Sequence, residues 1–292
     1  MTPRRENPSL AIALMLAATL FIAATTLLAK ALGTDALGEP LHALQISQGR
    51  FMFAFLGFGL VALALRPKIE RPNLPLHVAR SALGWGGISL LFAAVAFIPL
   101  SDATAISFLN PVFAMVLAIP ILGEKVGRIR WSAAFIALIG ALILIRPGPA
   151  SFQPAALLAL LAAVIMGAEI MCIKILSRGE ASFQILLINN AIGVCIATLA
   201  AIMVWQMPTL EQWAALAGIG VLMACAQACF VNAVARADAS LVVPFSYATL
   251  VFAALYDLLI FGVVPDAVSL TGAAIIIAGA LLLALREARL KK

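Results

Sequence analysis

The chain has 292 residues, of which 64% are apolar and 11% are charged, whereas soluble domains average about 45–50% and about 25%. This composition excludes a soluble globular protein, because no soluble fold has enough interior to hide so much apolar surface. The net charge of +6 could indicate a nucleic-acid partner, but the placement of the basic residues described below explains it as a membrane topology signal, so we expect no nucleic-acid binding.

Ten apolar stretches are each long enough to cross a bilayer as a helix, which needs about 20 residues. The first stretch follows Arg4 and Arg5 and is predicted to be a retained helix, because it is too long for a cleaved signal peptide. We therefore predict an all-α membrane protein in which residues 1–292 form a single transmembrane domain. The predicted spans are residues 10–31, 42–64, 76–98, 101–122, 128–146, 154–176, 182–205, 211–235, 239–262 and 267–285.

The connectors between these spans differ in charge on the two sides of the membrane. Of the 19 lysine and arginine residues, 16 are assigned to one side, Arg80 among them, whereas Asp35, Glu39, Glu211 and Asp266 fall on the other. Basic residues in short loops stay on the cytoplasmic side. We therefore expect a multi-pass protein of the bacterial inner membrane with both termini in the cytoplasm.

The two halves of the chain resemble each other weakly. Lys30 near the end of the first span matches Lys174 near the end of the sixth, and Gln45 matches Gln184 in the second and seventh spans. A repeat unit of five spans must enter the membrane in opposite directions in its two copies, so we predict two inverted five-helix repeats around a central cavity. Inverted repeats are typical of secondary transporters that work by alternating access. The predicted repeats are residues 10–146 and 154–286.

A motif in the fourth and fifth spans resembles a known family. Residues 107–113 read SFLNPVF, residues 120–125 read PILGEK, and Gly140 follows in the next span. This pattern is similar to EamA-type members of the drug/metabolite transporter superfamily, and the resemblance extends over nearly the whole chain. The second half departs from it after Gly262, where valines replace the Gly-Glu pair common in the family. The resemblance implies a ten-helix transporter that exports small metabolites, similar to the YddG-like amino-acid exporters.

Polar residues inside the spans are the candidates for solute contact, because each is costly unless it faces protein or water. His77, Ser81, Trp85 and Ser89 recur every four residues and therefore share one face of the third span. Such a face could form the wall of a cavity, with hydroxyl donors beside an aromatic ring. Alternatively, the serines bond their own backbone and His77 lies at the cytoplasmic interface.

Further candidates lie in the first, fourth, eighth and ninth spans. The prolines at 111 and 244 remove helix donors, and irregular backbone at such points is tolerated only beside protein or a wet cavity. Bonding between helices is the alternative for each polar side chain. The additional candidate solute-binding residues are Thr26, Ser107, Asn110, Gln227, Ser246 and Tyr247.

Charged residues inside the spans need partners. Arg50 and Asp257 are predicted at similar depth near the outer side, where they could form an ion pair with each other. Lys30 is close enough to a surface to extend toward water. Glu169 is a candidate for proton coupling, because a buried carboxyl can titrate near neutral pH. Structural pairing or contact with cytosolic water is the alternative for Glu169.

Other function classes find little support in the sequence. Tyr256-Asp257 matches half of an intramembrane aspartyl protease signature, but the partner Gly-x-Gly-Asp is missing. The four cysteines lack the spacing of metal sites, and we expect no catalytic residues, metal or cofactor. Hydroxyl, amide and indole groups favour a small amphipathic solute, with amino acids as the main hypothesis and lipophilic cations as the alternative. Ten helices can enclose a pathway in one chain, so we expect a functional monomer in the lipid bilayer.

Overall fold

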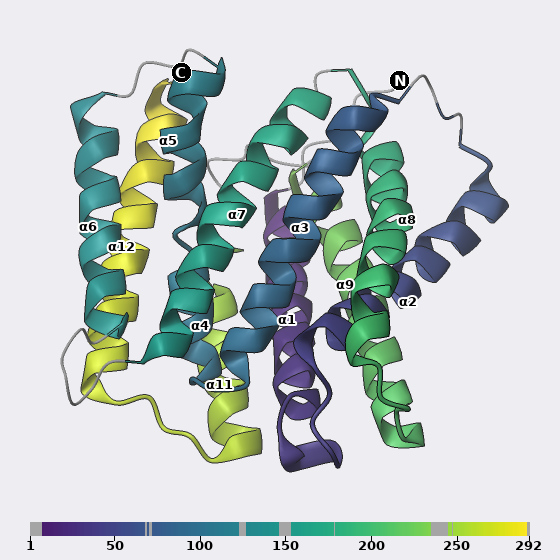
Figure 1. Cartoon of the computed structure of the whole chain (residues 1–292). Helices are drawn as coiled ribbons and strands as arrows, with labels where there is room; N and C mark the ends of the chain where they lie inside the picture. The colour runs from purple at the N-terminus through teal and green to yellow at the C-terminus, as the bar shows by residue number, and fades with distance from the viewer. Residues whose placement is uncertain are drawn as a thin grey trace.

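The computed structural model describes residues 8–67, 69, 72–122, 127–145, 153–177, 179–234, 245–246 and 248–290. All regular secondary structure within these residues is helical (Figure 1). In chain order the helices are α1 (Pro8–Leu32), η1 (Asp35–Leu37), α2 (Ala43–Leu65), α3 (Leu74–Val95), α4 (Leu100–Ser107), α5 (Asn110–Leu122), α6 (Arg128–Ile145), α7 (Pro154–Leu176), α8 (Ser182–Ala201), η2 (Ile202–Val204), α9 (Leu210–Val234), α11 (Ala248–Phe261) and α12 (Ala267–Leu290).

These helices follow the predicted spans closely. Within the described residues, seven helical stretches are long and apolar enough to cross a membrane, and they coincide with predicted spans one to four and six to eight. The other three predicted spans correspond to α6, α11 and α12, whose qualifying apolar stretches are shorter. The ninth predicted span begins before α11, at residues that lie outside the described part of the chain.

The fourth predicted span is broken in its middle. Helix α4 ends at Ser107 and α5 begins at Asn110, and the intervening Leu109 bonds the carbonyl of Ile106 three residues back instead of continuing the α-helical pattern. The break lies directly before Pro111, which has no N–H to donate. Every residue of α4 is buried, so the irregular backbone lies inside protein, as the membrane environment requires.

The helices alternate in direction between two faces of the bundle (Figure 1). We call the face at the top of Figure 1, where α3 and α8 begin, the upper face, and the opposite one the lower face. Helix α1 begins and α12 ends toward the upper face. Many large apolar side chains are exposed on the outside of the bundle, among them Leu63, Phe135 and Val251. Such a surface is expected to contact lipid rather than water.

The main helix contacts join the first half of the chain to the second. Helix α1 packs against α9 and α11, α2 against α8 and α9, α3 against α7 and α8, α5 against α7, and α6 against α12. The α2–α9 contact is close because Gly220 faces the α2 backbone: a Cβ atom at that position would lie 2.3 Å from Phe53 Cβ and 2.8 Å from the Ala54 nitrogen. The two halves therefore form one tightly interleaved bundle.

Candidate functional site

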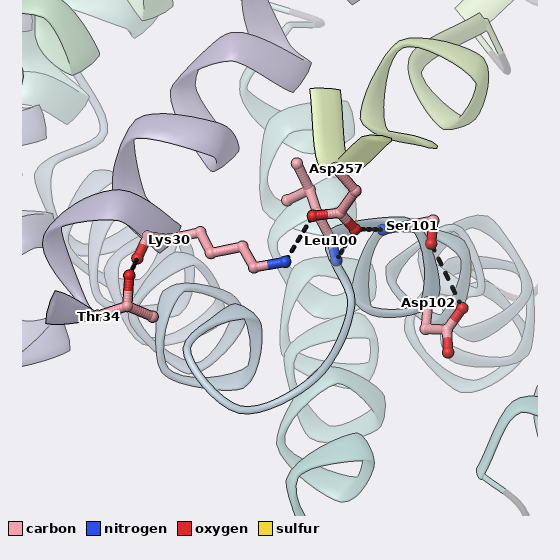
Figure 2. Close-up of polar contacts among 6 residues, drawn as sticks. All are labelled: Lys30, Thr34, Leu100, Ser101, Asp102 and Asp257. Carbon is pink, nitrogen blue, oxygen red and sulfur yellow. Dashed lines mark hydrogen bonds and ion pairs between the residues drawn. The ribbon is translucent and has the colours of Figure 1, made fainter. Parts of the chain in front are cut away.

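The lower end of the bundle contains a buried ion pair with a complete set of partners (Figure 2). Lys30 Nζ on α1 donates to Asp257 Oδ1 on α11 at 2.5 Å. The other carboxylate oxygen of Asp257 accepts the backbone N–H groups of Leu100 at 2.6 Å and Ser101 at 3.3 Å. These N–H groups open helix α4, where the helix dipole favours a negative charge. Asp257 is 0% exposed, and its charge is neutralised and hydrogen-bonded on both oxygens.

This geometry corrects two predictions. The predicted ion pair between Arg50 and Asp257 is wrong, because Lys30 is the partner of Asp257. Lys30 does not extend to the surface either: it is buried, and its ammonium lies 4.6 Å from the centre of the Phe261 ring. Both corrections have one cause, since α1 packs directly against α11 and brings the lysine to the carboxylate.

Further contacts near the lower face also join the two halves of the chain. The Gln45 amide donates to the Gln206 carbonyl at 2.6 Å and accepts the N–H of the same residue at 3.1 Å. The Gln212 amide donates to the Glu39 carbonyl at 2.8 Å. Deeper, the hydroxyl of Ser269 donates to Asp102 at 3.0 Å. The lower end of the bundle is therefore held together by polar contacts across the halves.

A second cluster of buried charges lies between α2, α3 and α7. Arg80 Nη2 on α3 lies 3.7 Å from Glu169 Oε1 on α7, and Arg80 Nη1 donates to the Ile185 carbonyl at 3.1 Å. The charge of Arg50 on α2 interacts with those of both Glu169 and Arg80. Gly84 on α3 makes room for the carboxylate, because a Cβ there would lie 2.9 Å from Glu169 Oε1. We call Arg50, Arg80 and Glu169 the arginine cluster.

Several donors in and near the arginine cluster have no acceptor among the described residues. They are Arg50 Nε and Nη1, Arg80 Nε and the indole nitrogen of Trp85, which lies five residues beyond Arg80 on α3. Arg50 is 6% exposed and Arg80 is 4% exposed. The guanidinium of Arg50 does lie over the Phe51 ring, 4.4 Å from its centre. Buried donors without acceptors are rare in native structures and call for an explanation.

A cavity of about 470 Å³ lies between α1, α3, α7, α8 and α9. Arg80 and Gln227 contribute polar groups to its wall, and the remaining wall is mainly apolar, with residues such as Ile22 and Met223. Ser177 and Ser182, at either end of the α7–α8 connection, also line it, so the cavity reaches the upper face. This size and mainly apolar lining suit a small organic molecule.

The predicted polar face of α3 is divided among several partners. His77 Nε2 contacts Glu180 Oε2 at 2.7 Å in the α7–α8 connection. Ser81 donates to the Asn189 carbonyl at 3.4 Å, and Ser89 donates to Ser47 at 2.8 Å. These contacts join α3 to neighbouring helices, so the serines do not bond their own backbone. Two polar atoms of this face have no partner among the described residues: Nδ1 of His77, whose other ring nitrogen contacts Glu180, and the indole nitrogen of Trp85.

Glu180 has a carboxylate that is strongly hydrogen-bonded. Burial opposes its ionisation, but the backbone N–H of Asn73 and the side chains of His77 and Gln184 donate to it at 2.9, 2.7 and 2.7 Å. These bonds outweigh burial, so the pKa of Glu180 is lowered from its ordinary value.

The remaining predicted site residues are scattered. Gln227 lines the cavity, and its amide oxygen has no donor among the described residues. Thr26 and Ser107 donate to carbonyls of their own helices, Ile22 and Thr104, so these hydroxyl bonds do not join two helices, which was the alternative considered for them. Among the described residues, Asn110 opens α5 and the carbonyl of Ser246 accepts from Thr249, and neither position shows a side-chain contact that defines a site. Tyr247 lies outside the described residues.

Arg80 is the main residue of the site that the sequence interpretation missed. It had been assigned to the basic residues of a cytoplasmic connector, although it falls within the predicted third span at residues 76–98. A charge one residue before the predicted polar Ser81 was the available signal. Within the described part of the chain, no group of three His, Cys, Asp or Glu residues could hold a metal ion.

The chain belongs to the EamA-like transporter family, whose family model matches it twice, at residues 9–146 and 153–285. A riboflavin transporter of Vibrio cholerae is 34% identical over 75% of this chain and 74% of its own length. The pseudopaline exporter CntI of Pseudomonas aeruginosa is 28% identical over 78% and 82%, and an S-adenosylmethionine uptake transporter of Rickettsia bellii is 28% identical over 86% and 87%.

A solved crystal structure shares the fold, with a TM-score of 0.67 and 19% identity over 99% of this chain and 100% of that chain. This protein is therefore a multi-pass membrane transporter for small metabolites, of the EamA type of the drug/metabolite transporter superfamily. The relatives above are named for riboflavin, pseudopaline and S-adenosylmethionine, and for both export and uptake. They give no specific support to the predicted similarity to YddG-like amino-acid exporters.

Proposed function

We propose that this protein exports small amphipathic metabolites, with neutral amino acids as the leading class, by alternating access. In this proposal ten helical segments cross the bacterial inner membrane as two inverted repeats, residues 10–146 and 154–286. A single chain forms the pathway, and both termini are cytoplasmic. The central cavity then opens to the cytoplasm in the conformation described above.

The pattern of helix contacts supports the inverted repeats. If the two halves are repeats, α1 is equivalent to α7, α2 to α8, and α3 to α9, and each contact should have an equivalent in which these helices are exchanged. The α1–α9 contact has its equivalent in α7–α3, and the α2–α9 contact in α8–α3. Exchanging α5 with α11 turns α5–α7 into α11–α1, which also occurs. The α2–α8 and α6–α12 contacts are unchanged by the exchange. The two separate family-model matches agree with the same division.

One observation carries the proposed mechanism: a cavity reaches the upper face, while the buried Lys30–Asp257 pair and its neighbours join the halves at the lower end. Alternating access requires a site that is open to one side and closed to the other. Exposing the cavity to the lower face would require separation of α1 from α11 and therefore rupture of the ion pair. The pair thus acts as the closed gate of this conformation.

The charges near the cavity favour the amino-acid hypothesis over lipophilic cations. A cation exporter needs an available carboxylate in its pathway. Glu169 is the carboxylate that the sequence favoured for this role, but Arg80 lies 3.7 Å from it and the charge of Arg50 also acts on it. A lipophilic cation would have to compete with both arginines, so this alternative is the weaker one.

Counterflow in proteoliposomes tests the proposal. Labelled methionine, threonine and phenylalanine should exchange, whereas a quaternary ammonium should not. Robust flux of the ammonium without exchange of any amino acid would reverse this ranking. An imposed pH gradient then tests proton coupling through Glu169. If that carboxyl carries the proton, pH-driven flux should be lost in Glu169→Gln. Unchanged flux in this variant would exclude Glu169 from proton coupling.

Labelling of a single cysteine tests the orientation. The four native cysteines are replaced, Gln227→Cys is introduced into the cavity wall, and a membrane-impermeant maleimide is applied to right-side-out and inside-out vesicles. We expect faster labelling in inside-out vesicles, which expose the cytoplasmic face. Labelling only from the opposite side would contradict the proposed orientation.

A further inference from the structure

The arginine cluster has more donors than the described part of the chain supplies acceptors for. A guanidinium carries five N–H donors and keeps its charge at any physiological pH. Arg50 has two nitrogens without an acceptor among the described residues, and Arg80 and Trp85 have one each. A buried donor left unpaired costs about 1–3 kcal/mol, and more when it is charged. The cluster is therefore incomplete as a purely structural element.

The charges of the cluster also do not balance. Arg80 lies 3.7 Å from Glu169, and the charge of Arg50 interacts with both, so these three described residues together have one positive charge left over. Two other carboxylates already have partners of their own. Glu180 contacts His77, and Asp257 at the lower end of the bundle is paired with Lys30. An unbalanced charge inside the membrane region is expensive. One added negative charge would neutralise the cluster, whereas a dianion such as a phosphate monoester would leave an excess negative charge beside Glu169.

A solute in the cavity can reach the cluster through Arg80, which forms part of the cavity wall. Two side-chain amide oxygens in the same region could accept from an amine, because they have no donor among the described residues. One belongs to Gln227 in the cavity wall. The other belongs to Asn189, whose backbone carbonyl accepts from Ser81 on α3. Donors and acceptors are thus both left unused around one cavity. A zwitterionic solute carries the complementary groups.

We propose that Arg50 and Arg80 bind the carboxylate of the transported solute, with the Trp85 indole as a third donor. This inference rests on the proposed transport function and names the solute group that the site recognises. A carboxylate is a planar monoanion that accepts two parallel N–H bonds from one guanidinium. A solute carboxylate would therefore accept hydrogen bonds from the donors that lack a partner, and its single negative charge would neutralise the cluster.

Counterflow with a matched set of solutes and variants tests this assignment. The solutes are an amino acid that exchanges, its amide, which keeps the amine but lacks the carboxylate, and a phosphate monoester as competitor. The variants are Arg50→Gln, Arg50→Lys and Arg80→Gln. The control is Arg66→Gln, the same substitution on an exposed arginine at the end of α2.

We expect Arg50→Gln and Arg80→Gln to raise the KM for the amino acid at least tenfold, and Arg66→Gln to leave it unchanged. Arg50→Lys keeps the charge but not the planar fork, so it should restore the KM only in part. The amide should be a poor solute for the wild type, and its residual KM should not respond to the arginine variants. Where Arg50→Gln does not fold, Arg50→Lys and Arg80→Gln carry the test.

Two results would overturn the inference. One is an equal loss of amino-acid and amide exchange in the arginine variants, which a merely structural role predicts. The other is competition by the phosphate monoester that exceeds competition by a simple carboxylate. Failure of the wild type to exchange any solute of the set is a different outcome, because it removes the proposed function itself.

Discussion

The two buried charge clusters of this transporter are built in opposite ways. Lys30 and Asp257 neutralise each other, and the backbone N–H groups of Leu100 and Ser101 occupy the remaining carboxylate oxygen. The arginine cluster has a surplus positive charge and several donors that find no acceptor among the residues the structure describes. A complete cluster holds two parts of a protein together, whereas an incomplete one is a place where a ligand can complete it. In the proposed mechanism, this difference assigns closure to the lower end and solute recognition to the cavity.

Breaking the lower pair should have the largest effect on stability. Asp257→Ala leaves Lys30 as an unpaired buried charge and two N–H groups without an acceptor, which should destabilise the protein by about 3–5 kcal/mol. Thermal unfolding in detergent measures this loss. Asp35→Ala, at an exposed aspartate near the same face, is the control. The double variant Lys30→Met/Asp257→Leu should recover much of the loss, and an Asp257→Ala protein as stable as the control would contradict the account.

Disrupting the contact between α2 and α9 should have the second largest effect on stability. This contact holds α2, the helix that carries Arg50. In Gly220→Ala the new Cβ would meet Phe53 Cβ and the Ala54 backbone, and backbone cannot move aside cheaply. We expect a loss of about 1–3 kcal/mol from overpacking, again measured by thermal unfolding. Gly59→Ala on α2, with no atom within 4 Å of its Cβ, should be neutral or slightly stabilising. Equal behaviour of the two variants would refute the close contact.

Gly84→Ala should affect recognition more than stability. Its Cβ would meet the flexible end of Glu169 at 2.9 Å, so the carboxylate should move away from α3 and from Arg80 on the same helix. Arg80 is then freer to bind an anion, and the KM for a carboxylate solute should fall by about two- to fivefold, or roughly 0.4–1 kcal/mol. Gly86→Ala, whose Cβ contact of 3.9 Å is ordinary, is the control. A higher KM in Gly84→Ala would count against the role of Glu169 as a competing carboxylate.

The smallest effect is expected at Glu180, outside the spans. Its pKa is lowered in the folded protein, so its bonds contribute stability above the ordinary glutamate pKa of about 4.3, and this contribution is lost as the pH falls through the lowered value. Unfolding measured between pH 7 and pH 3 should show a steeper acid loss in the wild type than in Glu180→Gln. Parallel curves for the two proteins would show that this carboxylate is not linked to stability.

Hydrophobic patterning was enough to predict most of the fold. The apolar stretches located the helices, and Pro111 marked the break between α4 and α5. The pairing of charges was not predictable, because depth along a helix does not say which helix packs beside it. Arg50 and Asp257 were matched by depth alone, whereas the α1–α11 contact gives Asp257 to Lys30. Arg80 was missed because a basic residue near a span boundary was assigned to the loop.

The most direct test is the thermal stabilisation of purified protein by an exchangeable amino acid. A ligand that binds only the folded protein raises its unfolding temperature, and the rise grows with the ratio of the ligand concentration to its Kd. The account predicts a rise in the wild type and in Lys30→Met/Asp257→Leu, where the arginine cluster is intact, and no rise in Arg50→Gln. A rise in Arg50→Gln as large as in the wild type would show that the solute does not bind at the arginine cluster.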